Sequence, residues 1–213
     1  GGWDGAAVGA RAARAWEERL REGGFLDDRT PMPTAAALRA VRGALPRETP
    51  VTTDVGGFRL WAKQVFDAYA PEGYVTAGSW AGMGVGLPAA VGAAVGTGGQ
   101  VACLTGDGGL LMSLGSLHVA SEEGLDLLCV VFDNADYGVI SASDQIPADG
   151  PRFDWTAPDF ATVAEGMGWR GERAETVGAL RDAVEGAVET GGPVLVDAVV
   201  DPTERTAAAA SGD

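Results

Sequence analysis

Basic residues are scarce in this chain, and lysine is almost absent. The 213 residues include 15 Lys and Arg against 30 Asp and Glu, which gives a formal net charge of −15, and Lys63 is the only lysine. Proteins bind nucleic acids and anionic membranes through basic patches, which this composition disfavours. We therefore expect neither a nucleic acid nor a membrane as a partner.

The acidic excess has several explanations. Strong acidity with so little lysine is a pattern that we associate with salt-loving organisms, whose proteins keep a hydrated, carboxylate-rich surface. A GC-rich genome, which favours Arg, Ala and Gly, and ordinary surface charge for solubility are the alternatives. These explanations can hold together.

Cysteine and histidine are also rare, which disfavours several kinds of site. Cys103 and Cys129 lie inside apolar stretches without Cys-x-x-Cys spacing, so we expect buried free thiols rather than a disulfide, redox centre or metal site. His118, the only histidine, lies among apolar residues. We expect it to be structural, with a place near a ligand as the alternative.

No apolar run is long enough for a signal peptide or a membrane span. The chain begins at Gly1 rather than Met. We therefore expect a piece of a longer, cytoplasmic protein.

Short apolar runs alternate with segments of helical periodicity, the pattern of an α/β fold. Strands are expected near residues 50–55, 74–77, 100–105, 125–132, 168–174 and 194–200. Helices are expected near residues 34–45, 58–70, 86–97, 111–123, 158–167 and 176–190. We predict a doubly wound, mainly parallel six-stranded sheet with helices on both faces.

The same pattern divides the chain into three parts. Residues 1–33 are expected to form a connecting amphipathic helix (3–21) and a loop (23–33), and residues 34–202 the α/β domain. Residues 203–213 are Ala-rich with little apolar bulk, and we expect a disordered tail.

Two oxygen-bearing side chains follow neighbouring apolar strands. Asp107 comes directly after the strand expected at 100–105, and Asn134 follows the strand expected at 125–132. In a right-handed βαβ unit, the residues after adjacent strands converge in the crevice where open α/β sheets bind ligands. We therefore expect Asp107 and Asn134 to meet there.

The chemistry of this pair favours Mg²⁺ or Ca²⁺ over thiol-loving metals, because carboxylate and amide oxygens are hard ligands. Mg²⁺ held by so few protein groups usually also binds phosphate. Gly108 and Gly109 would allow close backbone approach, and a helix beginning near Leu110 would direct its N–H groups at the anion. An ordinary Gly-Asp-Gly turn is the alternative.

The spacing of these residues resembles the signature of thiamine-diphosphate-dependent enzymes, which opens with Gly-Asp-Gly and closes on Asn. Here Asn134 follows Asp107 by 134 − 107 = 27 residues, and residues 134–138 read Asn-Ala-Asp-Tyr-Gly, similar to the family's Asn-x-x-Tyr-Gly. The resemblance implies Mg²⁺ bound by Asp107, Asn134 and the Asp136 carbonyl. Asp133 stands where the family often has Asn, and this extra acid could alter metal affinity or face solvent.

A second segment, residues 78–92, resembles acetolactate synthase. In that family a bulky residue at the position of Met83 wedges between the two cofactor rings, and a neighbouring backbone carbonyl, here assigned to Gly82, contacts the pyrimidine. The alternative is that Met83 is a flexible core residue at a helix entrance.

A third segment, Asp54-Val55-Gly56-Gly57-Phe58, resembles the family's Asp-Val-Gly loop, whose backbone N–H groups hold the diphosphate. Acetolactate synthases often have Gln-His where this chain has Gly57 and Phe58, so polar side-chain contacts are absent. An ordinary strand-to-helix turn is the alternative. The residues that the three segments assign to the cofactor are Gly56, Gly57, Phe58, Gly82, Met83, Gly106, Asp107, Gly108, Gly109, Asn134, Tyr137 and Gly138.

The resemblance implies the diphosphate-binding domain of an acetolactate synthase-like enzyme that decarboxylates a 2-oxo acid and joins the product to a second one. A simple 2-oxo acid decarboxylase of the benzoylformate or sulfopyruvate kind is an alternative, followed by a flavin-dependent oxidase. A non-catalytic nucleotide-binding α/β module is an alternative of another class.

The resemblance also implies partners. No acid of this chain can be assigned the role of the glutamate that activates the cofactor, which the family carries on a pyrimidine-binding domain, usually of a second subunit. We therefore expect that missing domain as a partner, a homodimer or higher oligomer, and an isolated chain that is inactive.

Overall fold

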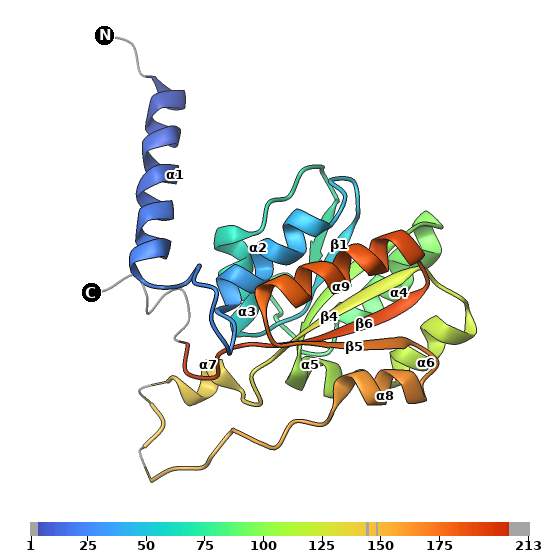
Figure 1. Ribbon diagram of the computed structural model, residues 1–213. Coiled ribbons are helices and arrows are strands. Elements are labelled where there is room, and N and C mark those ends of the chain that lie inside the picture. Colours follow the sequence, from blue (N-terminus) through green and yellow to red (C-terminus); the bar gives the residue numbers. More distant parts are fainter. Residues whose placement is uncertain (1–3, 144, 148, 205–213) are drawn as a thin grey trace.

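The computed structural model, which describes residues 4–143, 145–147 and 149–204, contains a six-stranded sheet in which every neighbouring pair of strands is parallel. The spatial order is β2-β1-β3-β4-β6-β5 (Figure 1). The strands are β1 (Val51–Thr53), β2 (Tyr74–Thr76), β3 (Val101–Gly106), β4 (Leu127–Asp133), β5 (Arg170–Ala174) and β6 (Pro193–Val199). The predicted α/β class and parallel sheet are confirmed.

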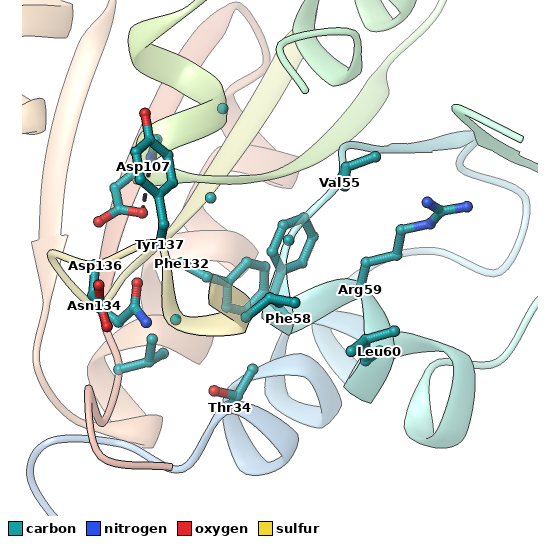
Figure 2. A pocket seen from close by; sticks show the side chains of 18 of the residues that line it. Thr34, Val55, Phe58, Arg59, Leu60, Asp107, Phe132, Asn134, Asp136 and Tyr137 are labelled. Atoms are coloured by element: carbon teal, nitrogen blue, oxygen red, sulfur yellow. Dashed lines mark hydrogen bonds between the residues drawn. The ribbon is translucent and has the colours of Figure 1, made fainter. Parts of the chain in front are cut away.

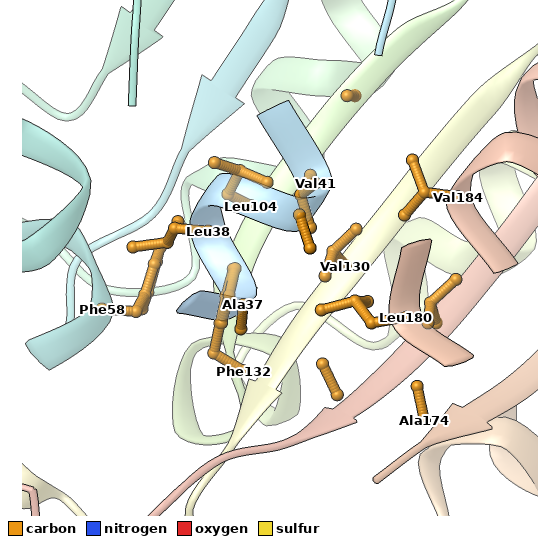
Figure 3. Packing of buried hydrophobic residues seen from close by; sticks show 14 of the residues in the cluster. Ala37, Leu38, Val41, Phe58, Leu104, Val130, Phe132, Ala174, Leu180 and Val184 are labelled. Atoms are coloured by element: carbon orange, nitrogen blue, oxygen red, sulfur yellow. The ribbon is translucent and has the colours of Figure 1, made fainter. Parts of the chain in front are cut away.

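Helices cover both faces of the sheet. One core, drawn in Figure 3, joins the sheet to α2 (Thr34–Ala44), α3 (Gly57–Val65) and α9 (Val177–Thr190). The other core joins the opposite face to α4 (Gly86–Thr97), α5 (Asp107–Leu111), α6 (Gly115–Glu122) and α8 (Phe160–Gly166). The central strands β3 and β4 are buried on both sides, which explains their unbroken apolar sequences.

The N-terminal helix α1 (Gly5–Glu22) projects away from this body (Figure 1). Only Leu20 of α1 is fully buried, and Glu17 pairs with Arg39 of α2 at 2.7 Å. The helix expected over 3–21 is therefore present, apart from Trp3, which lies outside the described residues. Among the residues that the structure describes, no helix is both long and apolar enough to cross a bilayer.

Three helix predictions differ from the structure. The helix expected over 111–123 is mainly α6, which begins only at Gly115, and Leu111 is the last residue of the separate helix α5. The two helices are separate because the Ser113 hydroxyl binds the Gly109 carbonyl and Gly115 has low helix propensity. The helix expected to reach residue 70 ends at Val65, where Phe66 turns extended and packs near Tyr74. The short helix α7 (Gly138–Ser141) was not predicted.

The two cysteines lie where the apolar runs place them. Cys103 and Cys129 are register partners on β3 and β4, fully buried and free. The adjacent Cys103 and then burial raise the pKa of Cys129, which keeps this thiol protonated. The expectation of buried free thiols is confirmed.

The strand order reverses between β1 and β3. The chain moves outward from β1 to β2, crosses back, and then proceeds from β3 to β4 on the other side. In such sheets the crevice beyond the carboxyl ends of the strands at the reversal binds ligands. Asp54 follows β1 and Asp107 follows β3, so the fold places both acids at this crevice.

Gly171 tests the packing of α8 on the edge strand β5. A Cβ atom there would lie 2.2 Å from the Ala161 carbonyl oxygen, a backbone atom that cannot move aside. We expect Gly171→Ala to lower the free energy of unfolding by about 1–3 kcal/mol, measured by urea denaturation. The matched control is Gly186→Ala in α9, where no atom lies within 4 Å and a gain of about 0.5–1 kcal/mol is expected. Equal stability changes in the two variants would contradict this account.

Candidate functional site

A cavity of about 350 Å³ opens at the carboxyl edge of the sheet. Its walls come from the loops after β1, β3 and β4, from the loop before α4, and from the chain after β6 (Figure 2). Most residues that the sequence assigned to a cofactor line this cavity, namely Gly56, Gly57, Phe58, Met83, Gly106, Asp107, Gly108, Gly109, Asn134, Tyr137 and Gly138. Gly82 does not line it, although its neighbours Ala81 and Met83 do.

The Asp54 carboxylate joins two of these loops to strand β3. Its Oδ1 accepts from the N–H of Val55 at 2.7 Å and of Val85 at 3.4 Å. Its Oδ2 accepts from the Gly84 N–H and from the Thr105 hydroxyl, each at 3.1 Å. Asp54 is fully buried, so these donors replace water around its charge and hold the two loops and β3 in one arrangement.

Two glycines make room for Asp54. A Cβ atom on Gly86 would lie 2.8 Å from the Asp54 Cβ, and one on Gly109 would lie 2.7 Å from Asp54 Oδ2. These positions therefore need glycine for packing. The sequence motifs assign no role to Asp54, although this acid comes directly after the first apolar strand.

Asp107 is buried with half of its carboxylate unused. Its Oδ1 accepts from the Gly108 N–H at 2.8 Å, whereas Oδ2 is buried without a partner in the described chain. Burial, together with the adjacent Asp133, raises the pKa of Asp107 to about 8, although the backbone N–H groups of Gly108 and Ala135 act in the opposite direction. The charged form of this group therefore lacks a positive partner, which a divalent cation would supply.

Asp133 is buried beside Asp107, so the idea that it faces solvent is wrong. Its Oδ1 accepts from the Ala135 N–H at 3.0 Å, and Arg173 Nη1 lies 3.9 Å from its Oδ2. The same guanidinium pairs closely with Asp197, which is fully buried. Burial, and then the charge of Asp133, raise the pKa of Asp197 to about 6 against the opposing charge of Arg173. The burial follows from the position of Asp133 as the last residue of the buried strand β4.

The residues after β4 form the next wall. The Asp136 side chain accepts from the Ser141 hydroxyl at 2.5 Å, and no backbone N–H of the described chain donates to its carbonyl. The Tyr137 ring packs over Gly108, where a Cβ atom would lie 2.5 Å from Tyr137 Cε1, and meets Trp155 edge-on at 4.7 Å. The Asp136 carbonyl and the Asn134 amide are thus available at the cavity wall.

The third wall is the start of α3. Gly56 precedes the helix without a side-chain cap, so the first N–H groups of α3 have no partner within the helix. The Phe58 ring instead stacks on Phe132, with centroids 5.1 Å apart and planes at 5°. The Phe58 side chain is an apolar ring packed in the core, so the only polar groups that Phe58 can offer the cavity are those of its backbone.

His118 lies exposed on α6 and does not line the cavity. The alternative prediction, that His118 lies near a ligand in this cavity, is therefore wrong. The described residues contain no cluster of three or more His, Cys, Asp or Glu side chains suited to a metal. A metal held by one carboxylate, one amide and one backbone carbonyl would not form such a cluster, because only the carboxylate comes from these four side-chain types.

The last wall includes residues that sequence reasoning left out of the site. Val200, Asp201 and Glu204 line the cavity after β6, and Glu204 accepts from the Thr34 N–H at 2.9 Å at the start of α2. Thr203 and Glu204 begin the segment expected to be disordered, yet Thr203 donates to Asp201. Residues 205–213 of that segment lie outside the described residues. No local pattern marks Glu204, because its contact spans 170 positions of sequence.

Comparison with known proteins identifies relatives of this arrangement. Residues 54–198 match the family model described as thiamine pyrophosphate enzyme, C-terminal TPP binding domain. The matched range begins at Asp54 and includes the loops after β3 and β4.

Named relatives include acetolactate synthases. The chain is 30% identical over 161 residues to the probable acetolactate synthase large subunit of Methanococcus aeolicus, covering 74% of this chain and 27% of that protein. It is 30% identical over 172 residues to acetolactate synthase isozyme 2 large subunit of Escherichia coli, covering 79% and 31%. This chain therefore spans less than a third of the length of these two relatives.

Solved structures share the fold. A benzoylformate decarboxylase from Polynucleobacter necessarius aligns with a TM-score of 0.77 at 23% identity, covering 83% of this chain and 34% of that one. A thiamin diphosphate-dependent enzyme from Mycobacterium smegmatis, described as putative, aligns with a TM-score of 0.71 at 23% identity, covering 81% and 32%. At this identity the likeness shows the fold alone.

Asp54 provides a test of how the loops are held. Asp54→Asn replaces one acceptor oxygen with an NH₂ group, which leaves at least one loop N–H buried without an acceptor. We expect the free energy of unfolding to fall by about 2–4 kcal/mol, measured by urea denaturation. Thr105→Val, which removes only the side-chain donor, is expected to cost about 1 kcal/mol. A smaller loss for Asp54→Asn than for Thr105→Val would refute the central role of Asp54.

Proposed function

Because this chain belongs to the thiamine pyrophosphate enzymes and carries their C-terminal TPP-binding domain, we propose that it binds thiamine diphosphate through Mg²⁺ and acts on 2-oxo acids. The reaction that we favour is decarboxylation followed by carboligation, as in an acetolactate synthase. The observation that carries the proposal is the buried Asp107 carboxylate, which has an unpartnered oxygen and belongs to a residue that lines the cavity beside several glycines.

The residues present fit the metal and the diphosphate. Asp107, Asn134 and the Asp136 carbonyl would hold Mg²⁺, and all three residues line the cavity. Gly108 allows Tyr137 to close over the β3–α5 turn, since a side chain there would collide with that ring. The free N–H groups at the start of α3 suit the diphosphate, because a helix N-terminus favours anions.

Thiamine diphosphate, when bound, supplies a carbanion nucleophile and then an electron sink for decarboxylation. The chain's own contribution is binding and shape. Met83 lies in the wall at the loop that Asp54 anchors, so its position is fixed through the Gly84 and Val85 N–H groups. This supports a wedge role for Met83 against the organic part of the cofactor.

The remaining wall is mostly apolar and excludes water from the reacting groups. Apolar side chains from two loops and from α3, β4 and α7 line it, namely Val55, Phe58, Leu60, Met83, Phe132, Val139 and Ile140. A simple 2-oxo acid decarboxylase would use the same wall. The product distinguishes the two reactions, because carboligation gives an acetohydroxy acid and simple decarboxylation gives an aldehyde. The family membership favours this cofactor over a nucleotide.

The proposal also assigns partners. The activating glutamate is expected from a pyrimidine-binding domain that this chain does not supply. Helix α4 supports association with a second copy, because it carries no charged residue and yet exposes Pro88, Ala89, Gly92 and Val95. A helix that is apolar on all sides usually lies buried. Trp80, 93% exposed in the loop before α4, adds to this surface.

Asp107→Asn tests the metal site. The amide keeps the shape but cannot supply the charge that Mg²⁺ requires. Losing a residue that only orients a metal ligand already costs about 10- to 100-fold in metal affinity, so we expect the loss of a ligand itself to weaken Mg²⁺-dependent thiamine diphosphate binding by at least about 100-fold. Isothermal titration of thiamine diphosphate with and without Mg²⁺ measures this. Asp182→Asn on α9 is the matched control, since it makes the same charge change at an exposed position. Unchanged binding by Asp107→Asn would remove Asp107 from the ligand set.

Val95→Glu tests association. Val95 is 64% exposed on α4, so an added charge should leave the fold intact and weaken self-association by about tenfold or more. Light scattering across a concentration series measures the change. Ala179→Glu, which adds the same charge to exposed α9 on the other face of the sheet, should have no effect. If both variants associate as strongly as the parent, α4 is not the surface that binds a second copy.

A further inference from the structure

Arg59 has a buried donor that nothing in the described chain satisfies. Its Nε is buried without a partner, and its Nη2 makes one long hydrogen bond, 3.3 Å, to the Gly78 carbonyl. A guanidinium has five N–H groups, and a buried donor without an acceptor is costly. No carboxylate among the described residues pairs with Arg59, unlike Arg29, Arg39 and Arg173.

A neighbouring hydroxyl is in a similar state. The Tyr74 hydroxyl is buried and makes no hydrogen bond of good geometry within the described chain. Burial raises its pKa, while the nearby Thr53 side chain and then the positive charge of Arg59 oppose that rise. No carboxylate contributes to this balance. The region around Arg59 thus has unbalanced positive charge and free donors, the surroundings that an anion would complete.

Arg59 also stands apart within the cavity. It is the only basic side chain among the described residues that line the cavity. Figure 2 shows it beyond Val55 and Phe58, on the opposite side from Asp107, Asn134 and Asp136. The Arg59 side chain is therefore set apart from the groups that we propose for Mg²⁺ (Figure 2).

We propose that Arg59 binds a second anionic group of the substrate, so that the preferred substrate class is 2-oxo acids with a distal acidic group. The inference rests on the proposed function. Arg59 does not suit the carboxylate that leaves as CO₂. When that carbon–carbon bond breaks, the electron pair stays on the substrate, and an ion pair at the departing group would stabilise the ground state over the transition state. A distal carboxylate, sulfonate or phosphonate keeps its charge throughout.

Binding of inert dicarboxylates tests the assignment without turnover. In the chain loaded with thiamine diphosphate and Mg²⁺, glutarate and succinate are titrated by calorimetry, with butyrate as the monocarboxylate reference. We expect at least one dicarboxylate to bind more tightly than butyrate. Arg59→Met should weaken that dicarboxylate by about 10- to 100-fold and leave butyrate unchanged. Arg59→Lys should retain part of the preference, and exposed Arg181→Met should retain all of it.

The outcomes separate this inference from the proposed function. Thiamine diphosphate should bind Arg59→Met within about twofold of the parent; a large loss would mean that Arg59 serves the cofactor, which overturns the substrate assignment alone. Equal binding of glutarate, succinate and butyrate by the parent would also overturn it. A change in self-association with no change in dicarboxylate binding would assign the anion to a neighbouring subunit instead. Absent thiamine diphosphate binding in the parent would refute the proposed function itself.

Discussion

The buried carboxylate of Asp54 is the interaction on which the crevice depends. A fully buried charge is stable only when hydrogen bonds replace its lost water, and here the donors come from its own loop, from the loop before α4 and from Thr105 of β3. The charge therefore demands that three segments, distant in sequence, meet at one point. Gly86 and Gly109 lack side chains where a Cβ atom would occupy the space that this carboxylate needs.

A second buried acid at the same crevice, Asp107, has the opposite character. Asp54 is surrounded by donors, whereas Asp107 keeps a buried oxygen without a partner and has a pKa raised to about 8. Asp133 and Asp197 add negative charge nearby, and Arg173 compensates only part of it. A fold can sustain such an imbalance when a cation completes it, which is why we assign Asp54 to the scaffold and Asp107 to the metal.

Much of the fold was predictable because its strands are buried on both faces. Unbroken apolar runs such as 127–132 can form only central parallel strands or buried helices, and their length and the helical segments between them favour strands. The break between α5 and α6 was harder to predict, since Ser113 and Gly115 act only weakly against a helical pattern. Asp107 and Asn134 were predictable as neighbours because parallel strands bring their carboxyl ends to one edge.

The sequence by itself determined the α/β class, the parallel sheet and the family, because these depend on local periodicity and on short motifs with fixed spacing. Only the tertiary structure decided that Asp54 is a scaffold residue, that Asp133 is buried, that Gly82 lies outside the cavity wall and that Arg59 lacks an acceptor. Whether a charged side chain is satisfied depends on groups from distant segments, such as Gly84 for Asp54 or Gly78 for Arg59. Sequence periodicity does not reveal these contacts, since they form only when the sheet has formed and its loops have packed together.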